Sequence, residues 1–329
     1  MTRTRSFAAS LLTFSAAAML ALVGAGTAHA APPASDDQTT PAVASATVDS
    51  TGAAEYWTAD RMRAAVPGDV LAGNAIERRT SLNSAVDAAK EKDEVKDKKP
   101  KVKATKAVSG KSKLALKVTP VDHIGKVFFT MGGFNYVCSG NAVSSENGST
   151  VATAGHCLNE GPGAYATNFI FVPGYDNGKE PYGRWTARDL YTTPQWKTSG
   201  DIAFDTGFAV MNPNEDGETL TDVVGSSDVV FGIDRGLEYT SYGYPASTPY
   251  NGAQLWSCAG TATNDMTNPK FETQGIPCTM TGGSSGGPWL LDDGVQNSIN
   301  SYGYNGAEVM FGPYWGTEIE NVYNFAQAA

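Results

Sequence analysis

The chain has 329 residues, with 34 acidic residues against 24 basic ones and a net charge of −10. From residue 119 to the end, seven basic residues stand against 22 acidic ones, a net charge of −15. This excess of negative charge repels nucleic acids and anionic membranes, so neither is expected as a partner. About 210 residues in this part are enough to bury a sizeable core.

The first 30 residues have the pattern of a secretory signal peptide. Arg3 and Arg5 give a basic start, residues 11–23 are mostly apolar, and residues 28–30 form the small-residue cleavage pattern Ala-His-Ala. A membrane anchor is the alternative, but the apolar run is short for a bilayer span and no second run follows. We therefore expect residues 1–30 to be removed and the protein to be secreted.

Four cysteines occur, Cys138, Cys157, Cys258 and Cys278. An even number of cysteines in an exported protein favours two disulfides, and four cysteines permit three pairings. We favour Cys138–Cys157 and Cys258–Cys278, which join neighbours in the sequence. A metal site is not expected, because the spacing is unlike Cys-x-x-Cys and histidines are few.

Residues 31 to about 57 are rich in Ala, Pro, Ser and Thr, a composition typical of disordered chain. A short helix is predicted next, with Thr58 as its N-cap and Pro67 as its stop, and residues 81–92 suggest another. These pieces cannot bury a core of their own. We therefore predict that residues 31–118 form a largely disordered pro-segment.

A lysine-rich stretch ends this region. Between Lys90 and Val118 there are eleven lysines, four acidic residues and hardly an aromatic one. A nucleic-acid patch is the alternative, but it would show basic residues interleaved with aromatic ones. The stretch is better interpreted as a solvated, protease-sensitive linker.

From about residue 120 the chain consists of short segments rich in β-branched and aromatic residues, separated by turns. Asn-Gly pairs, each a hairpin signal, begin at residues 147, 177, 251 and 305. We predict an all-β domain over residues 119–329, a sandwich or a pair of barrels, with a helix only over 317–327. The clearest predicted strands are 125–131, 136–143, 168–174, 206–211, 238–245, 254–263 and 309–315.

Residues 281–289, TGGSSGGPW, surround Ser284 and Ser285 with glycines. Glycine-rich turns are common in β proteins, because glycine adopts positive φ freely. A serine nucleophile also needs such a place, clear of its own backbone and beside N–H groups that bind an oxyanion. This turn is therefore a candidate site of nucleophilic catalysis.

His156 follows a short apolar strand in VATAGHC, and a disulfide at Cys157 would fix the turn that carries it, which suits a general base. His123, at the start of the domain, is interpreted as structural. A histidine base needs an orienting carboxylate, and GDIAFDTGFAVM offers Asp201 and Asp205. We prefer Asp205, because choosing Asp201 leaves a second carboxylate to be neutralised within the following strand.

TAGHC at 153–157 and GSSGGP at 283–288 resemble the histidine and serine motifs of the chymotrypsin-fold, or trypsin-like, serine peptidases. The order His156, Asp205, Ser285 is also that family's order. The chain is most similar to the secreted bacterial branch near the V8 glutamyl endopeptidases. The resemblance implies two six-stranded antiparallel β-barrels with a short C-terminal helix.

The resemblance covers roughly residues 120–329 and implies a role for each matching residue. Ser285 would be the nucleophile, His156 the base and Asp205 its orienting acid, with an oxyanion hole formed by the N–H groups of Gly283 and Ser285. It also implies polypeptide substrates and no cofactor, and we expect a monomer. The residues that would contact the substrate are Thr279, Met280, Asn300, Ser301, Tyr302 and Gly303.

The chain departs from the trypsin-like pattern at three positions. Ser284 replaces the aspartate that pairs with a freed N-terminal amine, so we expect activation by unmasking, with residues 31–118 as the mask. Thr279 replaces the acid that selects basic side chains, and Asn300 replaces the histidine of glutamyl endopeptidases. We therefore expect cleavage after uncharged, medium or large side chains. A catalytically silent binding protein and an esterase on the same fold are the alternatives.

Overall fold

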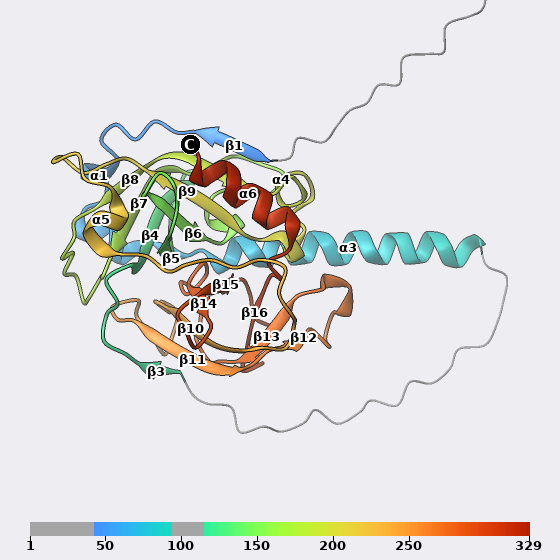
Figure 1. Ribbon diagram of the computed structural model, residues 1–329. Coiled ribbons are helices and arrows are strands. Elements are labelled where there is room, and N and C mark those ends of the chain that lie inside the picture. The colour runs from blue at the N-terminus through green and yellow to red at the C-terminus, as the bar shows by residue number, and fades with distance from the viewer. Residues whose placement is uncertain (1–42, 94–114) are drawn as a thin grey trace, which may run out of the picture. The chain divides into compact units, whose positions relative to one another are not determined.

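The computed structural model describes residues 43–93 and 115–329 (Figure 1). The signal peptide expected at residues 1–30, and residues 94–114 of the lysine-rich linker, lie outside the described residues. None of the helices in the described ranges is long and apolar enough to cross a membrane.

Six antiparallel strands close into a barrel in the first half of the domain. Their order is β7-β4-β5-β6-β9-β8, and the pairing of β8 with β7 closes the ring. The strands are β4 (Ile124–Met131), β5 (Phe134–Val143), β6 (Thr150–Thr153), β7 (Thr167–Pro173), β8 (Trp185–Thr192) and β9 (Gly207–Met211).

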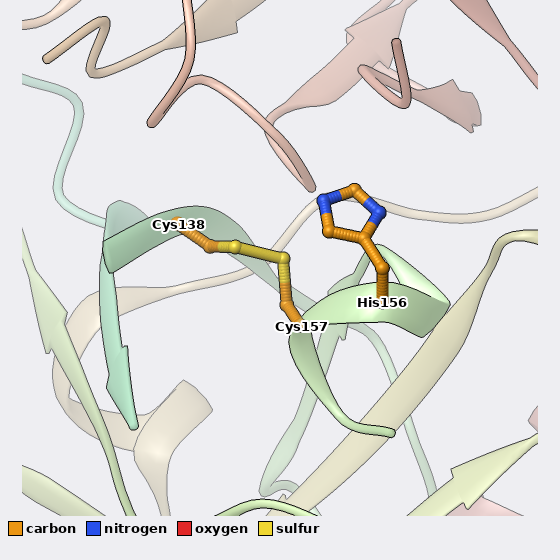
Figure 2. Close-up of side chains that lie close together, drawn as sticks. All are labelled: Cys138, His156 and Cys157. Carbon is orange, nitrogen blue, oxygen red and sulfur yellow. A yellow bond between two sulfur atoms is a disulfide. The ribbon is translucent and has the colours of Figure 1, made fainter. Parts of the chain in front are cut away.

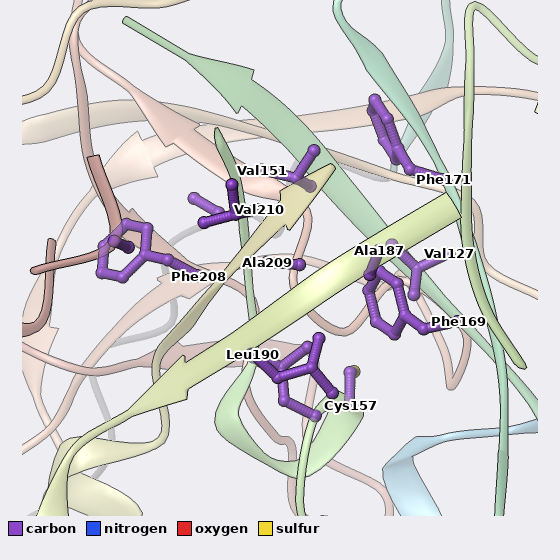
Figure 3. Close-up of a cluster of buried hydrophobic side chains, with 14 of the residues drawn as sticks. Val127, Val151, Cys157, Phe169, Phe171, Ala187, Leu190, Phe208, Ala209 and Val210 are labelled. Atoms are coloured by element: carbon purple, nitrogen blue, oxygen red, sulfur yellow. The ribbon is translucent and has the colours of Figure 1, made fainter. Parts of the chain in front are cut away.

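The barrel is filled by side chains that alternate along its strands, as the two-residue period of a strand requires. Val127 of β4, Phe171 of β7 and Leu190 of β8 are fully buried in one cluster (Figure 3). Phe208 and Val210 extend this cluster along β9. Burying a side chain of this size contributes about 1.5–3 kcal/mol, so the barrel is a rigid support for residues at its strand ends.

The second half forms two antiparallel sheets. The larger has the order β15-β14-β10-β11-β3 and the smaller the order β12-β13-β16. Trp289 and Tyr239 are buried between them. The strands are β3 (Leu116–Lys117), β10 (Glu238–Gly243), β11 (Trp256–Thr261), β12 (Thr263–Asn264), β13 (Gln274–Pro277), β14 (Pro288–Leu290), β15 (Gln296–Ile299) and β16 (Val309–Gly312).

The predicted fold class is confirmed, since a closed barrel, a second β half and a C-terminal helix are all present. Helix α6 (Thr317–Gln327) spans the residues expected from the sequence. It follows the second half in the chain but packs on β8 and β9 of the first barrel, where Ile319 and Val322 are buried. Short helices α4 (Pro194–Ser199) and α5 (Leu220–Val224) connect strands.

Residues 43–93 are ordered, whereas the sequence predicted that residues 31–118 are largely disordered. They form β1 (Ala44–Thr47), α1 (Ala53–Tyr56), α2 (Ala59–Ala64), β2 (Val66–Pro67) and the long helix α3 (Asp69–Asp93). Thr58 caps α2 as predicted, accepting a hydrogen bond from Arg61 N–H. The order comes from contacts with the β domain, because β1 pairs with β8 and β2 with β5.

Figure 1 shows α3 running along the boundary between the two halves of the domain. The helix buries Ala72 and Ala75 in one cluster with Trp196 of the first half and Phe271 and Tyr302 of the second. A sequence pattern within residues 31–118 could not predict this, since the apolar partners of the helix lie in a distant part of the chain.

Candidate active site

His156 lies in a single 3-10 turn, Gly155–Cys157, that directly follows strand β6. The Asp205 carboxylate holds it twice, accepting 2.7 Å hydrogen bonds from the His156 backbone N–H and from its ring Nδ1. Both side chains are fully buried. Because a carboxylate only accepts, Nδ1 carries the proton and Nε2 is left with a lone pair. This is the tautomer of a general base.

The other acid considered from the sequence lies elsewhere. Asp201 caps the short turn Ile202–Phe204 and forms a 2.9 Å ion pair with Arg79 of α3. His123 is also occupied, with its Nδ1 at 2.7 Å from Asn141 Oδ1. The structure therefore brings Asp205, rather than Asp201, to His156.

Ser301 supplies a contact that the sequence reasoning missed. Its hydroxyl donates to Asp205 Oδ2 at 2.5 Å, so Oδ2 accepts from both Ser301 and His156. The motif Ser-Tyr-Gly indicated only a substrate-contacting segment. The pairing arises because the Ser301 segment of the second half lies against the first barrel at this point, and no local pattern predicts such a long-range contact.

Ser284 and Ser285 have different surroundings. The hydroxyl of Ser284 turns back into its own loop and donates to Thr281 O at 2.7 Å. The hydroxyl of Ser285 makes no hydrogen bond within the described part of the chain. Gly286, the next residue, packs against Thr153 and Ala154, which lead directly into His156. The Ser285 turn and the His156 turn are thus neighbours across the two halves.

The loop before Ser285 presents two free N–H groups. Gly282 O accepts a 2.6 Å hydrogen bond from Ala246 N–H, so the Gly283 N–H of the same trans peptide points the opposite way. Gly283 has φ 96°, a conformation that favours glycine. Among the described residues, the N–H groups of Gly283 and Ser285 have no acceptor. Two such donors suit an oxyanion.

His156 also lies beside the two sulfur atoms of Cys138 and Cys157 (Figure 2). This grouping has the residue types of a metal site, but the sulfurs are joined in a disulfide with an S–S distance of 2.01 Å. Metal binding requires a thiolate, which a disulfide lacks. The second predicted disulfide, Cys258–Cys278, is likewise formed, so both pairings are confirmed.

A cleft of about 620 Å³ opens beside Ser285. Thr279 and Met280 line it, as expected from the sequence, and so do Ser301, Tyr302 and Gly303. Two of the described lining residues carry a carboxylate, namely Asp69 and Glu308, and Glu308 is exposed to solvent. Apart from these two carboxylates, the described residues that line the cleft carry no charged side chain.

Asn300 does not line this cleft, although the sequence placed it there. It is fully buried, and its Oδ1 accepts from Ser241 Oγ and Trp289 Nε1. Its Nδ2 donates to Tyr242 O and to Ser284 O, which holds the loop of the two serines. All the hydrogen-bonding capacity of the amide is used inside the second half, so Asn300 does not line the cleft and instead holds the loop of the two serines in place.

The segment around Gly303 is anchored by a buried acid that the sequence reasoning also missed. Asp265 is 1% exposed, and its Oδ2 accepts from Tyr302 Oη at 2.8 Å and Tyr304 Oη at 2.6 Å. Its Oδ1 accepts from the backbone N–H groups of Thr267 and Asn268. Asp265 thus ties both tyrosines that flank Gly303 to a neighbouring loop.

The start of α3 occupies the site. The carboxylate of Asp69 lies where a side chain on Gly282 would be, since a Cβ built there would be 2.1 Å from Asp69 Oδ1. Burial raises the pKa of the Asp69 carboxyl, an effect that the nearby His156 imidazole partly offsets. Asp69 Oδ1 and His156 Nε2 are both buried without a hydrogen-bond partner in the described ranges.

No protein-family model matches the chain. A stretch of 77 residues is 32% identical to the extracellular metalloprotease of Bacillus subtilis (strain 168), covering 23% of this chain and 24% of that protein. The chain thus matches about a quarter of the length of that curated relative.

The solved structures are similar over a longer part of the chain. Protease Anisep from Arthrobacter nicotinovorans is 63% identical, with 65% of this chain and 100% of that chain covered and a TM-score of 0.64. Serine protease AL20, a thermostable protein from an extremophilic microorganism, is 50% identical, with 63% and 98% covered and a TM-score of 0.61. A Glu endopeptidase, 20% identical with 65% and 97% covered, shares the fold at a TM-score of 0.53.

Proposed function

We propose that this chain, which belongs to the chymotrypsin-fold serine peptidases near the V8 group, is a secreted endopeptidase that uses Ser285, His156 and Asp205. The observation that carries the proposal is the double hydrogen bond from His156 to the buried Asp205 carboxylate. That contact orients the imidazole and leaves Nε2 as the base. Nε2 has no hydrogen-bond partner in the described ranges, and the Ser285 turn lies next to the turn that carries it.

The proposed reaction forms and then hydrolyses an acyl-enzyme. Ser285 Oγ attacks the scissile carbonyl carbon while His156 Nε2 takes the hydroxyl proton. The carbonyl oxygen gains negative charge and is bound by the N–H groups of Gly283 and Ser285. His156 then protonates the leaving amine, and the C–N bond breaks. Water, activated by His156, releases the acid and restores the Ser285 hydroxyl.

The negative charge of Asp205 stabilises the imidazolium that forms in each half of this reaction. Three hydrogen bonds hold the carboxylate in place, two from His156 and one from Ser301. Each removes a direction in which the acid could turn, so the base is set before substrate arrives. Such preorganisation is what distinguishes a catalytic constellation from three polar residues that are merely near one another.

Cleavage is proposed after uncharged side chains of medium or large size. Thr279 and Met280 line the cleft, and in a domain freed of Asp69 the carboxylate left among the described lining residues is that of the exposed Glu308. A buried Arg or Lys side chain would therefore meet no fixed carboxylate. None of the described residues that line the cleft is basic, so a Glu side chain would find no counter-charge there. Met280 adds a flexible apolar wall that adapts to different side chains. Mass spectrometry of a digested proteome tests this, and cuts mainly after Glu, Arg or Lys would refute it.

Reaction with a fluorophosphonate probe tests the nucleophile, because such probes bond covalently to activated serines. The expected result is one label, at Ser285, on protein freed of residues 43–93. No label on that protein would favour a catalytically silent binding protein. Digestion of a denatured protein then separates the peptidase from the esterase alternative, since an esterase would accept the label without cutting the polypeptide.

A further inference from the structure

Ser139 lies on strand β5, one residue after Cys138, and holds the Ser285 turn with both its side chain and its backbone. The residue is fully buried. Its hydroxyl donates to Gly283 O at 2.9 Å, and its backbone N–H donates to Ser285 O at 2.7 Å. One residue of the first barrel thus holds the carbonyls of both residues whose N–H groups suit an oxyanion.

The neighbouring carbonyls of this loop are held from the second half of the domain. Gly282 O accepts a hydrogen bond from Ala246 N–H. Ser284 O accepts one from the Asn300 amide. Because a peptide unit is planar, holding a carbonyl also fixes the direction of the N–H in the same unit. At each of the two residues with a free N–H, one flanking peptide unit is therefore held by the second half and the other by Ser139.

The Ser139 hydroxyl is itself fixed in direction. While its proton is donated to Gly283 O, its oxygen accepts a 2.9 Å hydrogen bond from Tyr244 N–H. Tyr244 is fully buried and precedes Ala246 by two residues, so the same hydroxyl also holds the segment that binds Gly282 O. A hydroxyl that donates once and accepts once in this way is bound on both sides.

Ser139 is also fixed relative to the base. Its carbonyl accepts from Thr153 Oγ1 at 2.8 Å, and Thr153 ends strand β6 three residues before His156. The residue before Ser139, Cys138, is bonded to Cys157, the residue after His156 (Figure 2). Both connections lie within the first barrel, whose packed core resists deformation. The position of Ser139 therefore follows that of His156.

This arrangement matters for the proposed reaction because its two main groups come from different halves of the domain. Ser285 must reach His156 within hydrogen-bond distance for the proton to pass. A misplacement of about 1 Å can cost on the order of 100-fold in rate. Gly282 and Gly283 have no side chains that could pack and hold the loop, so hydrogen bonds to its carbonyls must supply the restraint.

We propose that Ser139 is a positioning residue that sets Ser285 and the N–H groups of the oxyanion hole against His156. The proposal rests on the peptidase function proposed above. Ser139 does not line the cleft, and it acts only through the carbonyls that it holds. Its hydroxyl should therefore matter for kcat and little for KM.

Ser139→Ala tests the proposal, because it removes the hydroxyl but keeps the backbone hydrogen bond to Ser285 O. Each variant is made as the full chain, from which residues 43–93 are then removed. We expect kcat to fall roughly 10- to 50-fold with little change in KM, less than the roughly 10²- to 10³-fold cost of losing an oxyanion-hole donor itself. Values of kcat are given per Ser285 that a fluorophosphonate labels at completion, so unfolded protein does not contribute.

Ser149→Ala is the matched control. Ser149 is a buried serine directly before β6, and its hydroxyl also accepts from a backbone N–H, that of Leu220. This variant should keep the unsubstituted kcat. Equal kcat for Ser139→Ala and Ser149→Ala would overturn the proposal, since the loss of any buried hydroxyl in the first half would then have the same effect.

A peptide aldehyde distinguishes positioning from a general loss of structure. Ser285 Oγ adds to the aldehyde carbon, its proton passes to His156, and the former carbonyl oxygen becomes the oxyanion. In Ser139→Ala the inhibition constant of the aldehyde should rise by about the factor by which kcat/KM falls, because both depend on the same hole. A lowered kcat with an unchanged inhibition constant would contradict the proposal.

Thr153→Val decides the question if Ser139→Ala yields no folded protein. It leaves Ser139 in place but removes the hydrogen bond to its carbonyl, and it should lower kcat severalfold. Thr150→Val is its control, because Thr150 is buried on the same strand and donates to Asn147 Oδ1 instead. Equal kcat for the two threonine variants would then refute the role of Ser139.

The unsubstituted protein separates failure of this inference from failure of the proposed function. If the unsubstituted domain, freed of residues 43–93, neither hydrolyses peptides nor reacts with the fluorophosphonate, the peptidase function itself is refuted. If that domain is active and Ser139→Ala is equally active, the peptidase function stands and only the role of Ser139 is refuted.

Discussion

Ser301 donates its hydroxyl to the Asp205 carboxylate at 2.5 Å, and this bond joins the substrate-facing segment of one half of the domain to the acid of the other. Asp205 in turn fixes His156, which belongs to the first barrel. The constellation is therefore complete only when the two halves are packed together. Substitutions of the residues in this series of contacts therefore distinguish effects on the orientation of the base from effects on substrate binding.

Ser301→Ala removes one donor from a buried carboxylate. A hydrogen bond to a charged group is worth about 1.5–3 kcal/mol, so kcat should fall roughly 10- to 100-fold while KM changes little. Ser298→Ala is the control, because Ser298 is a buried serine on neighbouring β15 that donates to Pro313 O. Steady-state kinetics on one peptide substrate distinguish the two, and equal losses would mean that only packing was disturbed.

Asp205→Asn should keep the fold and lower kcat by about 10⁴-fold, because an amide donates to Nδ1 and favours the wrong imidazole tautomer. Asp201→Asn should leave kcat of the separated domain nearly unchanged, since Asp201 pairs with Arg79 of α3. Kinetics of both variants, with circular dichroism to verify folding, check the assignment. The reverse order of losses would transfer the orienting role to Asp201.

Asp265→Ala should loosen the segment that carries Gly303, because two tyrosine hydroxyls lose their acceptor. We expect a severalfold higher KM for substrates with four residues before the cut and little change for those with one or two. Asp293→Ala, which removes an exposed acid that caps a turn, is the control. A change in kcat that is independent of substrate length would contradict a positioning role.

Asp69 gives the expected masking of the site by α3 a pH dependence. Burial raises the pKa of the docked Asp69 carboxyl above its value in a separated fragment of residues 43–93. The docked state therefore holds the proton more tightly, and inhibition is strongest below the free pKa of about 3.9 and weakens as pH rises through the docked pKa. Inhibition constants measured from pH 4 to pH 7 should show this weakening, and Asp69→Asn should abolish it. His156 is the titratable group facing Asp69, so Asp69→Asn must be compared at each pH with the unsubstituted fragment.

Lys126 makes the folding stability depend on pH in the alkaline range. Lys126 is 5% exposed, and its ammonium donates to Gly252 O and lies over the rings of Phe128 and Tyr175. Burial lowers its pKa to about 7. The unfolded chain, with a lysine pKa near 10.4, binds more protons above pH 7, so stability should rise from about pH 7 to about pH 10. Thermal unfolding should show this slope, and Lys126→Met should flatten it. The same slope in both proteins would show that another group causes it.

The sequence predicted those parts of the fold whose cause is local. Strand β4 and helix α6 follow from apolar patterns, and both disulfides join neighbouring cysteines. Strand β15 was missed because three of its four residues are polar. Gln296, Asn297 and Ser298 are nonetheless buried, each hydrogen-bonded to a distant residue. Hydrophobic pattern cannot reveal a strand that is buried through hydrogen bonds.

The candidate site likewise contains residues that local motifs predicted and residues whose roles depend on long-range contacts. His156 and Ser285 stand in short motifs whose chemistry can be read directly. The Asp265 contact with Tyr302 and the α3 helix over the cleft depend on residues far apart in the chain, so no motif predicted them. Asn300 shows the converse, since a motif position suggested substrate contact where the tertiary structure buries the side chain.

The most direct test of the account compares Ser285→Ala with Ser284→Ala in the domain separated from residues 43–93, using kcat for one peptide substrate. The account predicts a loss of roughly 10⁴- to 10⁶-fold for Ser285→Ala, because the nucleophile is gone. Ser284→Ala should keep most activity, since its hydroxyl bonds only to Thr281 O within its own loop. Cleavage by the Ser285→Ala protein at near the unsubstituted rate would contradict the account.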